Sequence, residues 1–336
     1  MSVSSSVLAG DRLALTRLLT QVENNTPEGL TALDELFPHS GKAHLIGVTG
    51  APGTGKSSLV NQLALHYRKQ AGKSVAIIAV DPSSPFSGGA VLGDRVRMKD
   101  LGGDPGVFIR SMAARGSVGG LAETTASFVQ VFDAAGYEIV IIETVGAGQG
   151  EVDIARLAHT TIVVEAPGFG DEIQAIKAGI LEIADILVIN KADRPGVEHT
   201  EKALKLMLEL GHTIEHEMIH HGQKMEVQSP SGDPSNGGEF WIPPILKTVA
   251  IEGTGVQELA EEITRHAEML RRTGEWTGRE RLRLTVEVEN RMRESLWSDF
   301  QQRYSDQTYR NVLQKVYDRD LSPQAAVKEL MNGRKR

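Results

Sequence analysis

The stretch HLIGVTGAPGTGKS, residues 44–57, decides the fold of this chain. Its first half is apolar and rich in β-branched residues, which predicts a buried strand, and its second half follows the pattern G-x-x-x-x-G-K-S. Glycines permit the backbone conformations that turn successive N–H groups toward one anion. The stretch therefore predicts a phosphate-binding loop between a strand and a helix, and this context argues against an ordinary glycine-rich turn.

Each residue of this loop receives an expected role. The ammonium of Lys56 is expected to act on the outer phosphates during catalysis, and the hydroxyl of Ser57 suits Mg²⁺. The other expected nucleotide contacts come from Gly50, Ala51, Pro52, Gly53, Thr54, Gly55 and Ser58.

A second motif indicates which base is bound. Residues 185–193 read DILVINKAD, which places Asn190, Lys191 and Asp193 at the end of an apolar run. The carboxylate of Asp193 can accept hydrogen bonds from N1–H and the amine of guanine, whereas adenine presents a lone pair there. Sites of this kind can discriminate by roughly 10⁴-fold. The motif favours guanine over the alternative of a polar turn, and we add Ala250, after a possible strand at 245–249, to the nucleotide contacts.

Composition narrows the class of protein. The 336 residues exceed the usual single α/β domain, which favours one nucleotide domain with appendages. The chain contains no cysteine and therefore no disulfide or thiolate metal site. Its formal charge of −8 argues against nucleic acid as a partner. Neither an export signal nor a membrane span is evident, so we expect a cytoplasmic protein.

The order of apolar segments predicts an α/β fold of the P-loop NTPase class. Two short amphipathic helices are expected within residues 7–40. Fully apolar runs then alternate with helical patterns, which predicts a mostly parallel sheet covered on both faces, with ligands at the carboxyl ends of its strands. The predicted strands after the first are residues 75–80, 107–109, 139–142, 161–164 and 186–189, with 245–249 possible.

Three domains are expected from these patterns. Residues 1–41 form an N-terminal helical extension and residues 42–272 the nucleotide domain, in which 211–244 is a polar, irregular excursion. Residues 273–336 are helical, with an apolar residue at every fourth position from 288 to 300. This stripe either packs on the chain's own sheet or serves as a dimerisation arm, and we prefer the arm and hence a homodimer.

Two carboxylates are expected at the ends of predicted strands, where a metal-bound triphosphate would lie. They are Asp81 and Glu143, and together with Ser57 they suffice for Mg²⁺, which takes few protein ligands and retains waters. The alternative is that both are solvated acids. The sequence ETVGAGQ, residues 143–149, also has the form of a second switch, in which the backbone of Gly146 approaches the γ-phosphate.

At this point the chain resembles one family, the MeaB/ArgK-type GTPases, called MMAA in animals. The resemblance covers roughly residues 9–330. It rests on the phosphate loop and on the segments VDPSS (80–84), FSGGAVLGDRVRM (86–98), FIRSMAARG (108–116), ETVGAGQ (143–149), GDEIQAIKAG (170–179) and NKAD (190–193).

The resemblance implies a GTP-hydrolysing chaperone of an adenosylcobalamin-dependent acyl-CoA mutase, such as methylmalonyl-CoA mutase. It implies a homodimer whose slow GTP hydrolysis, accelerated by the mutase, gates cofactor loading and protects the mutase. Segments 86–98, 143–151 and 166–178 resemble three switches, with Asp94 of the first facing the metal site. We further expect a cobalamin adenosyltransferase among the partners.

Several residues keep two interpretations. Lys177 is either a third-switch lysine that reaches the nucleotide in the complex or a solvated lysine, and Arg110 and Arg115 either supply transition-state charge or pair with nearby acids. Histidines at 212, 216 and 220 repeat at helical spacing, but solvent exposure is favoured over metal binding. Two alternative functions remain, a nickel-insertion GTPase and a small-molecule kinase. The chain lacks the Cys- or His-rich motif expected of a nickel-insertion GTPase, and a small-molecule kinase would not need a guanine-selecting motif.

Overall fold

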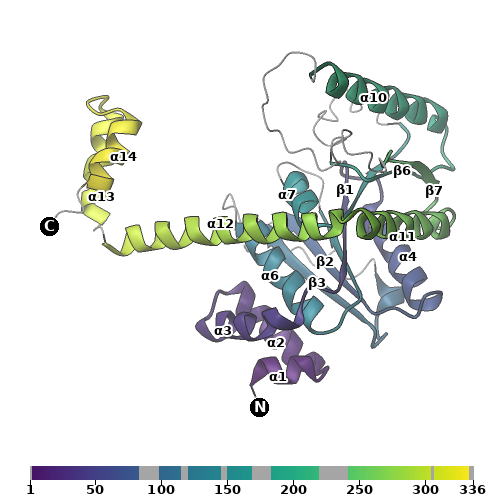
Figure 1. The fold of residues 1–336 in the computed structure, drawn as a ribbon, viewed down its shortest axis with the longest axis horizontal. Helices are drawn as coiled ribbons and strands as arrows, with labels where there is room; N and C mark the ends of the chain where they lie inside the picture. Colours follow the sequence, from purple (N-terminus) through teal and green to yellow (C-terminus); the bar gives the residue numbers. More distant parts are fainter. Residues whose placement is uncertain are drawn as a thin grey trace. The chain divides into compact units, whose positions relative to one another are not determined.

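The computed structural model describes residues 2–82, 98–114, 120–144, 150–168, 183–218, 241–303 and 306–332. Its centre is a seven-stranded sheet in the order β3-β2-β4-β1-β5-β6-β7, in which every pair of neighbours runs parallel (Figure 1). The strands are β1 (His44–Thr49), β2 (Val75–Pro82), β3 (Val107–Ala114), β4 (Ile139–Glu143), β5 (Thr160–Glu165), β6 (Ile186–Asn190) and β7 (Ile245–Thr248). The predicted α/β fold and all its predicted strands are confirmed.

Helices precede, separate and follow these strands. They are α1 (Val3–Leu8), α2 (Arg12–Glu23), α3 (Pro27–Leu36), α4 (Lys56–Lys69), α6 (Gly120–Ala134), α7 (Gly150–Leu157), α10 (Val197–Met218), α11 (Val256–Thr273), α12 (Glu275–Arg303), α13 (Asp306–Tyr317) and α14 (Pro323–Asn332). Two short 3₁₀ turns, η1 (Phe37–His39) and η2 (Lys99–Leu101), complete the described elements. None of these helices is long and apolar enough to span a lipid bilayer.

Both faces of the sheet are covered, as the apolar strands predict. On one face Leu45 of β1 and Val140 of β4 pack with residues of α1, α2, α3, α6 and α7. On the other face Ile46 of β1 and Ile141 of β4 pack with α4 and α11. Successive side chains of a strand point to opposite faces, so each strand contributes to two cores. Figure 1 shows α6 and α4 on opposite sides of the strands.

The N-terminal helices begin with side-chain caps. Asp11 accepts the backbone N–H groups of Leu13 and Ala14 at the start of α2, and Thr26 accepts that of Gly29 at the start of α3. These are the two helices predicted within residues 7–40. The short helix α1 was not predicted, because five of its six residues are serine or valine at positions without apolar periodicity.

Helix α10 corrects one prediction. It runs from Val197 to Met218 and therefore passes through Gly211, so residues 211–218 are helical rather than irregular. A single glycine costs a helix only about 1 kcal/mol relative to alanine, which neighbouring helix formers can offset. Residues 219–240 lie outside the described residues, as do His220 and the side chains of the other two histidines of the repeat. Within the part of the chain that is described, no three His, Asp or Glu side chains gather as a metal site.

The chain divides into two compact units, residues 1–284 and 285–336. The second unit has a small core of its own, formed by Val312, Ala326 and Leu330. On its part of α12, Val288, Met292 and Leu296 are 57–59% exposed. The predicted stripe is thus present on the helix surface of the single chain.

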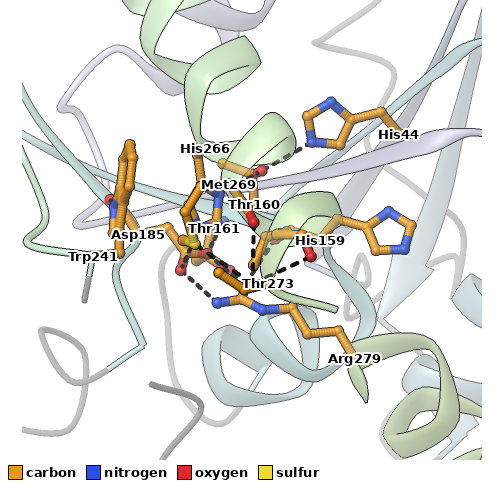
Figure 2. A network of polar contacts seen from close by, with 11 residues as sticks. His44, His159, Thr160, Thr161, Asp185, Trp241, His266, Met269, Thr273 and Arg279 are labelled. Atoms are coloured by element: carbon orange, nitrogen blue, oxygen red, sulfur yellow. Dashed lines mark hydrogen bonds and ion pairs between the residues drawn. The ribbon is translucent and has the colours of Figure 1, made fainter. Parts of the chain in front are cut away.

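A buried polar network occupies the amino edge of the sheet, where the strands begin (Figure 2). Asp185, just before β6, accepts from the backbone N–H of Thr161 at 2.8 Å and from both terminal nitrogens of Arg279 on α12 at 2.8 Å. The same guanidinium donates to the carbonyl oxygen of His159 at 2.7 Å. Burial opposes ionisation of Asp185, but the charge of Arg279 outweighs it and holds the pKa of this carboxyl below its usual value. The first turns of α12 are therefore fixed to the sheet.

Histidine tautomers in this network follow from its hydrogen bonds. The Nδ1 atom of His159 accepts the backbone N–H of Leu45 at 3.1 Å, so Nε2 carries the proton and donates to Glu280 at 2.6 Å. A second proton on His159 would remove the bond from Leu45. Burial lowers the pKa of His159, and Glu280 opposes this only in part. Burial also lowers the pKa of His44 well below its usual value, and the charge of Arg271 adds to this effect.

We expect mild acid to destabilise the protein through these two histidines. The unfolded chain protonates them near pH 6.5, whereas the folded chain keeps them neutral to lower pH. Stability is therefore complete above pH 6.5 and falls below it, at up to about 1.4 kcal/mol per pH unit per histidine. Urea unfolding followed by tryptophan fluorescence above and below this pH measures the slope. His159→Asn should flatten it and the exposed control His199→Asn should not; equal wild-type stability at both pH values would contradict the assignment.

Candidate functional site

The loop after β1 approaches its neighbouring strands too closely for any side chain at two positions. Gly50 has φ +134°, and a Cβ atom there would lie 2.1 Å from the carbonyl oxygen of Val164 on β5. Gly55 has φ +94°, and a Cβ atom there would lie 2.4 Å from Nδ2 of Asn190. Only glycine fits both the conformation and the space. The spacing of the sequence motif is thus a consequence of where the loop crosses β5 and β6.

The loop surrounds the ammonium of Lys56. Its Nζ atom donates to the carbonyl oxygens of Gly50 at 2.8 Å and Ala51 at 2.9 Å, and the residue is only 6% exposed. Helix α4 begins at this residue, and its N-cap Gly55 provides no side-chain cap for the first amides. A helix N-terminus beside a lysine is an arrangement that attracts phosphate.

The next strand places a carboxylate beside the loop. Glu143 ends β4, which pairs with β1, and its Oε1 accepts a hydrogen bond from the Ser57 hydroxyl at 2.6 Å. Glu143 is 5% exposed. The structure therefore brings together two of the three predicted metal ligands. The third, Asp81, lies near the carboxyl end of β2, the strand next to β4, but its side chain lies outside the described residues.

Asn190 joins three segments of the site. Its Nδ2 donates to the carbonyl oxygen of Thr54 in the loop at 2.8 Å. Its Oδ1 accepts from the Thr248 hydroxyl at 3.1 Å and from the backbone N–H of Ala250 at 3.0 Å. Asn190 is 2% exposed, so these bonds satisfy a buried amide. The phosphate loop and the ends of β6 and β7 are thereby held as one assembly.

The remaining base-motif residues lie at the surface of this assembly. Lys191 has φ +58° and donates from Nζ to the carbonyl oxygen of Gly53 at 2.6 Å. Asp193 is exposed, in the turn that follows β6. The predicted phosphate and base residues thus lie at adjacent strand ends of one edge of the sheet.

Other predicted residues stand elsewhere or are outside the described part. Arg110, on β3, donates to the Glu23 carboxylate at 2.5 Å and lies over the Phe128 ring at 5.8 Å. In this structure it therefore pairs with a nearby acid, which is one of its two interpretations. Asp94, Arg115, Gly146 and Lys177 lie outside the described residues.

Sequence reasoning missed two threonine contacts. Thr144 donates from its hydroxyl to that of Thr49 at 3.0 Å, which joins the ends of β4 and β1, and both residues are buried. Thr248 supports Asn190 as described above. Each of these threonines lies within two residues of a predicted site residue, so position at a strand end is the signal that would have found them.

With this geometry established, a family model described as "Methylmalonyl Co-A mutase-associated GTPase MeaB" matches residues 15–305. The chain belongs to this family. It is therefore a GTPase with the P-loop fold.

Known proteins agree with this assignment. A putative GTPase of Pyrococcus horikoshii is 41% identical over 317 residues, which cover 94% of this chain and 92% of that protein. GTPase ArgK of Escherichia coli is 32% identical over an alignment covering 96% of this chain and 92% of that protein. A solved structure described as LAO/AO transport system kinase has a TM-score of 0.65 at 25% identity, and covers 99% of this chain and 97% of that one.

We expect Glu143→Gln to slow GTP hydrolysis by about 10- to 100-fold, as loss of a charged group near a metal typically does. GDP binding should survive, because the amide can still accept a hydrogen bond from Ser57. Single-turnover hydrolysis and GDP titration measure the two effects. The control is Glu138→Gln, an exposed carboxylate at the opposite end of β4. Wild-type hydrolysis by Glu143→Gln would remove Glu143 from the reaction.

Proposed function

We propose that this GTPase is a chaperone of an adenosylcobalamin-dependent acyl-CoA mutase of the methylmalonyl-CoA mutase type. In this role GTP hydrolysis gates cofactor loading and protects or reactivates the mutase. The observation that carries the proposal is the match to a mutase-associated GTPase family over residues 15–305. The geometry supports it, because one edge of the sheet joins the phosphate loop to the guanine motif through Asn190. A cobalamin adenosyltransferase is proposed as a second partner, and the cytoplasm as the compartment.

The same proposal assigns the nucleotide contacts. The loop from Gly50 to Ser58 binds the phosphates of GTP or GDP, Gly146 approaches the γ-phosphate, and Asn190, Lys191, Asp193 and Ala250 hold guanine. Mg²⁺ fits beside the Ser57 hydroxyl and the Glu143 carboxylate, because these oxygen ligands lie within one hydrogen bond of each other. Asp81 completes this set, and Asp94 of the first switch faces it. When bound, the metal offsets charge on the transferring phosphoryl group.

Coupling to the mutase is assigned to residues 166–178. This segment follows β5, whose end adjoins the phosphate loop at Gly50. Its described beginning, Ala166-Pro-Gly168, includes a glycine at φ +92°. A mutase that binds one arrangement of the segment better than another would shift its population, and by linkage the bound nucleotide would alter mutase affinity.

Lys177→Ala tests this coupling. If Lys177 reaches the nucleotide only in the complex, the ratio of mutase-stimulated to intrinsic hydrolysis should fall toward one. Groups delivered in trans in this way contribute about 10³-fold or more. Phosphate release by the full chain with and without purified methylmalonyl-CoA mutase measures the ratio. The control is Lys69→Ala, an exposed lysine at the far end of α4. Stimulation of the Lys177 variant at the wild-type level would remove this residue from the coupling; a wild type that no mutase stimulates would overturn the proposed function.

We further propose a homodimer formed through α12. Val288, Met292 and Leu296 follow one another at four-residue intervals, so they share a face of the helix, and all three are exposed in the single chain. Trp297, 51% exposed, widens this face. A self-complementary apolar stripe is what a two-fold interface requires.

Leu296→Glu should weaken this dimer by about 100-fold or more, because it places an unpaired carboxylate in an apolar interface. Sedimentation at micromolar concentration measures the change. The neighbouring charge substitution Arg293→Gln should have little effect, since this residue is exposed and its contacts with Glu289 and Asn290 lie within its own helix. A monomeric wild type under these conditions would refute the interface.

A further inference from the structure

A cavity of about 390 Å³ lies at the amino edge of the sheet, at the opposite end of the strands from the phosphate loop. Its walls include His44 and Ile139, the first residues of β1 and β4, and Tyr67 from the last turn of α4. Helix α11 closes another side through Thr264 and Arg271. Pockets that bind small molecules have volumes of roughly 300–1,000 Å³. The cavity is therefore large enough for a small metabolite.

Three permanent cations line this cavity without a carboxylate partner among the described residues. They are Lys42 before β1, Lys73 before β2 and Arg271 near the end of α11. The guanidinium of Arg271 lies over the Trp276 ring at 4.1 Å, a contact that does not neutralise its charge. Against the two carboxylates of the lining, Asp133 and Glu138, the three cations leave the cavity with a net charge of about +1, which attracts an anion.

The two carboxylates of the lining are already engaged by the backbone. Asp133 accepts the backbone N–H groups of Gly41 at 2.6 Å, Lys42 at 3.1 Å and Ala43 at 3.0 Å. Glu138 accepts the backbone N–H of Ser74 at 3.2 Å. These amides stabilise the two carboxylates, which therefore do not need the lining cations as hydrogen-bond partners.

Two residues of the cavity wall, Tyr67 and His44, carry buried polar groups. The hydroxyl of Tyr67 is buried and has no hydrogen-bond partner among the described residues, although the residue lines the cavity. A buried hydroxyl without a partner is uncommon in folded proteins. His44 also feels the positive charges of Arg271 and Lys73, which help to lower its pKa.

We propose that this cavity binds a small molecule that carries an oxyanion, either a phosphate or a carboxylate, at the edge of the sheet opposite the nucleotide. Lys73 and Arg271 bind the anionic group, and Lys42 contributes to the field at the entrance. Because Trp276 lies between Arg271 and the ring of His159, the occupant is linked to the first turns of α12 through stacked rings.

Calorimetry on the full-length protein tests the site. The protein is first saturated with a non-hydrolysable GTP analogue and Mg²⁺, so that the phosphate loop, including its γ-phosphate position, does not contribute, and is then titrated with inorganic phosphate or with succinate. We expect at least one of these to bind. Lys73→Gln and Arg271→Gln should each raise the dissociation constant by about tenfold, the effect of one charge-assisted hydrogen bond.

The matched control is Lys69→Gln, an exposed lysine four residues before Lys73 that does not line the cavity. Its dissociation constants should equal those of the wild type. Stronger binding of phosphate would identify a phosphorylated ligand, and stronger binding of succinate a carboxylate ligand. The proposal is overturned if neither probe shows binding at concentrations up to about 10 mM. The dissociation constant would then be too high for a specific small-molecule site. It is also overturned if both cation variants bind the probes as the wild type does.

Discussion

The site depends on the close packing of the phosphate loop against β5 and β6. At Gly50 the loop backbone touches the carbonyl of Val164, and at Gly55 it touches the amide of Asn190. This close packing fixes the two loop carbonyl oxygens that accept from Lys56 and the direction in which α4 begins. It also explains why the phosphate loop and the ends of β6 and β7 cannot move independently, since Asn190 binds both.

The two edges of the sheet are built on different principles. At the carboxyl edge, within the described residues, buried hydrogen bonds of Ser57 and Asn190 join the phosphate loop to the ends of β4, β6 and β7. At the amino edge, Asp185, Arg279 and His159 form a buried network that satisfies its own charges. Buried ion pairs add little net stability compared with apolar packing, but they require a defined arrangement of the two charged groups. One edge thus joins the phosphate loop to the Asn190 motif, while the other fixes the first turns of α12 to the sheet.

Much of this arrangement could be predicted from the sequence, because it is encoded by local patterns. Apolar runs gave the strands, and the glycine spacing of the loop and the Asn190 motif lie within a few residues each. The amino-edge network could not be predicted, since Asp185 and Arg279 are 94 residues apart and each resembles a solvated charge in its own segment. Gly211 misled the interpretation of α10 for the opposite reason, because a local helix breaker was overridden by its surroundings. Arg110 shows the same limit, since its partner Glu23 lies 87 residues away in the N-terminal helices.

The position of Arg279 restricts where this chain can be divided. By sequence pattern the C-terminal arm begins near residue 273, yet the first compact unit extends to residue 284. A chain shortened before Arg279 would leave the Asp185 carboxylate buried without its guanidinium. Such a loss typically costs about 3–5 kcal/mol, a large fraction of the stability of a domain. The first turns of α12 are therefore structurally part of the nucleotide unit, and any exchange of arms between relatives would have to join them beyond this point.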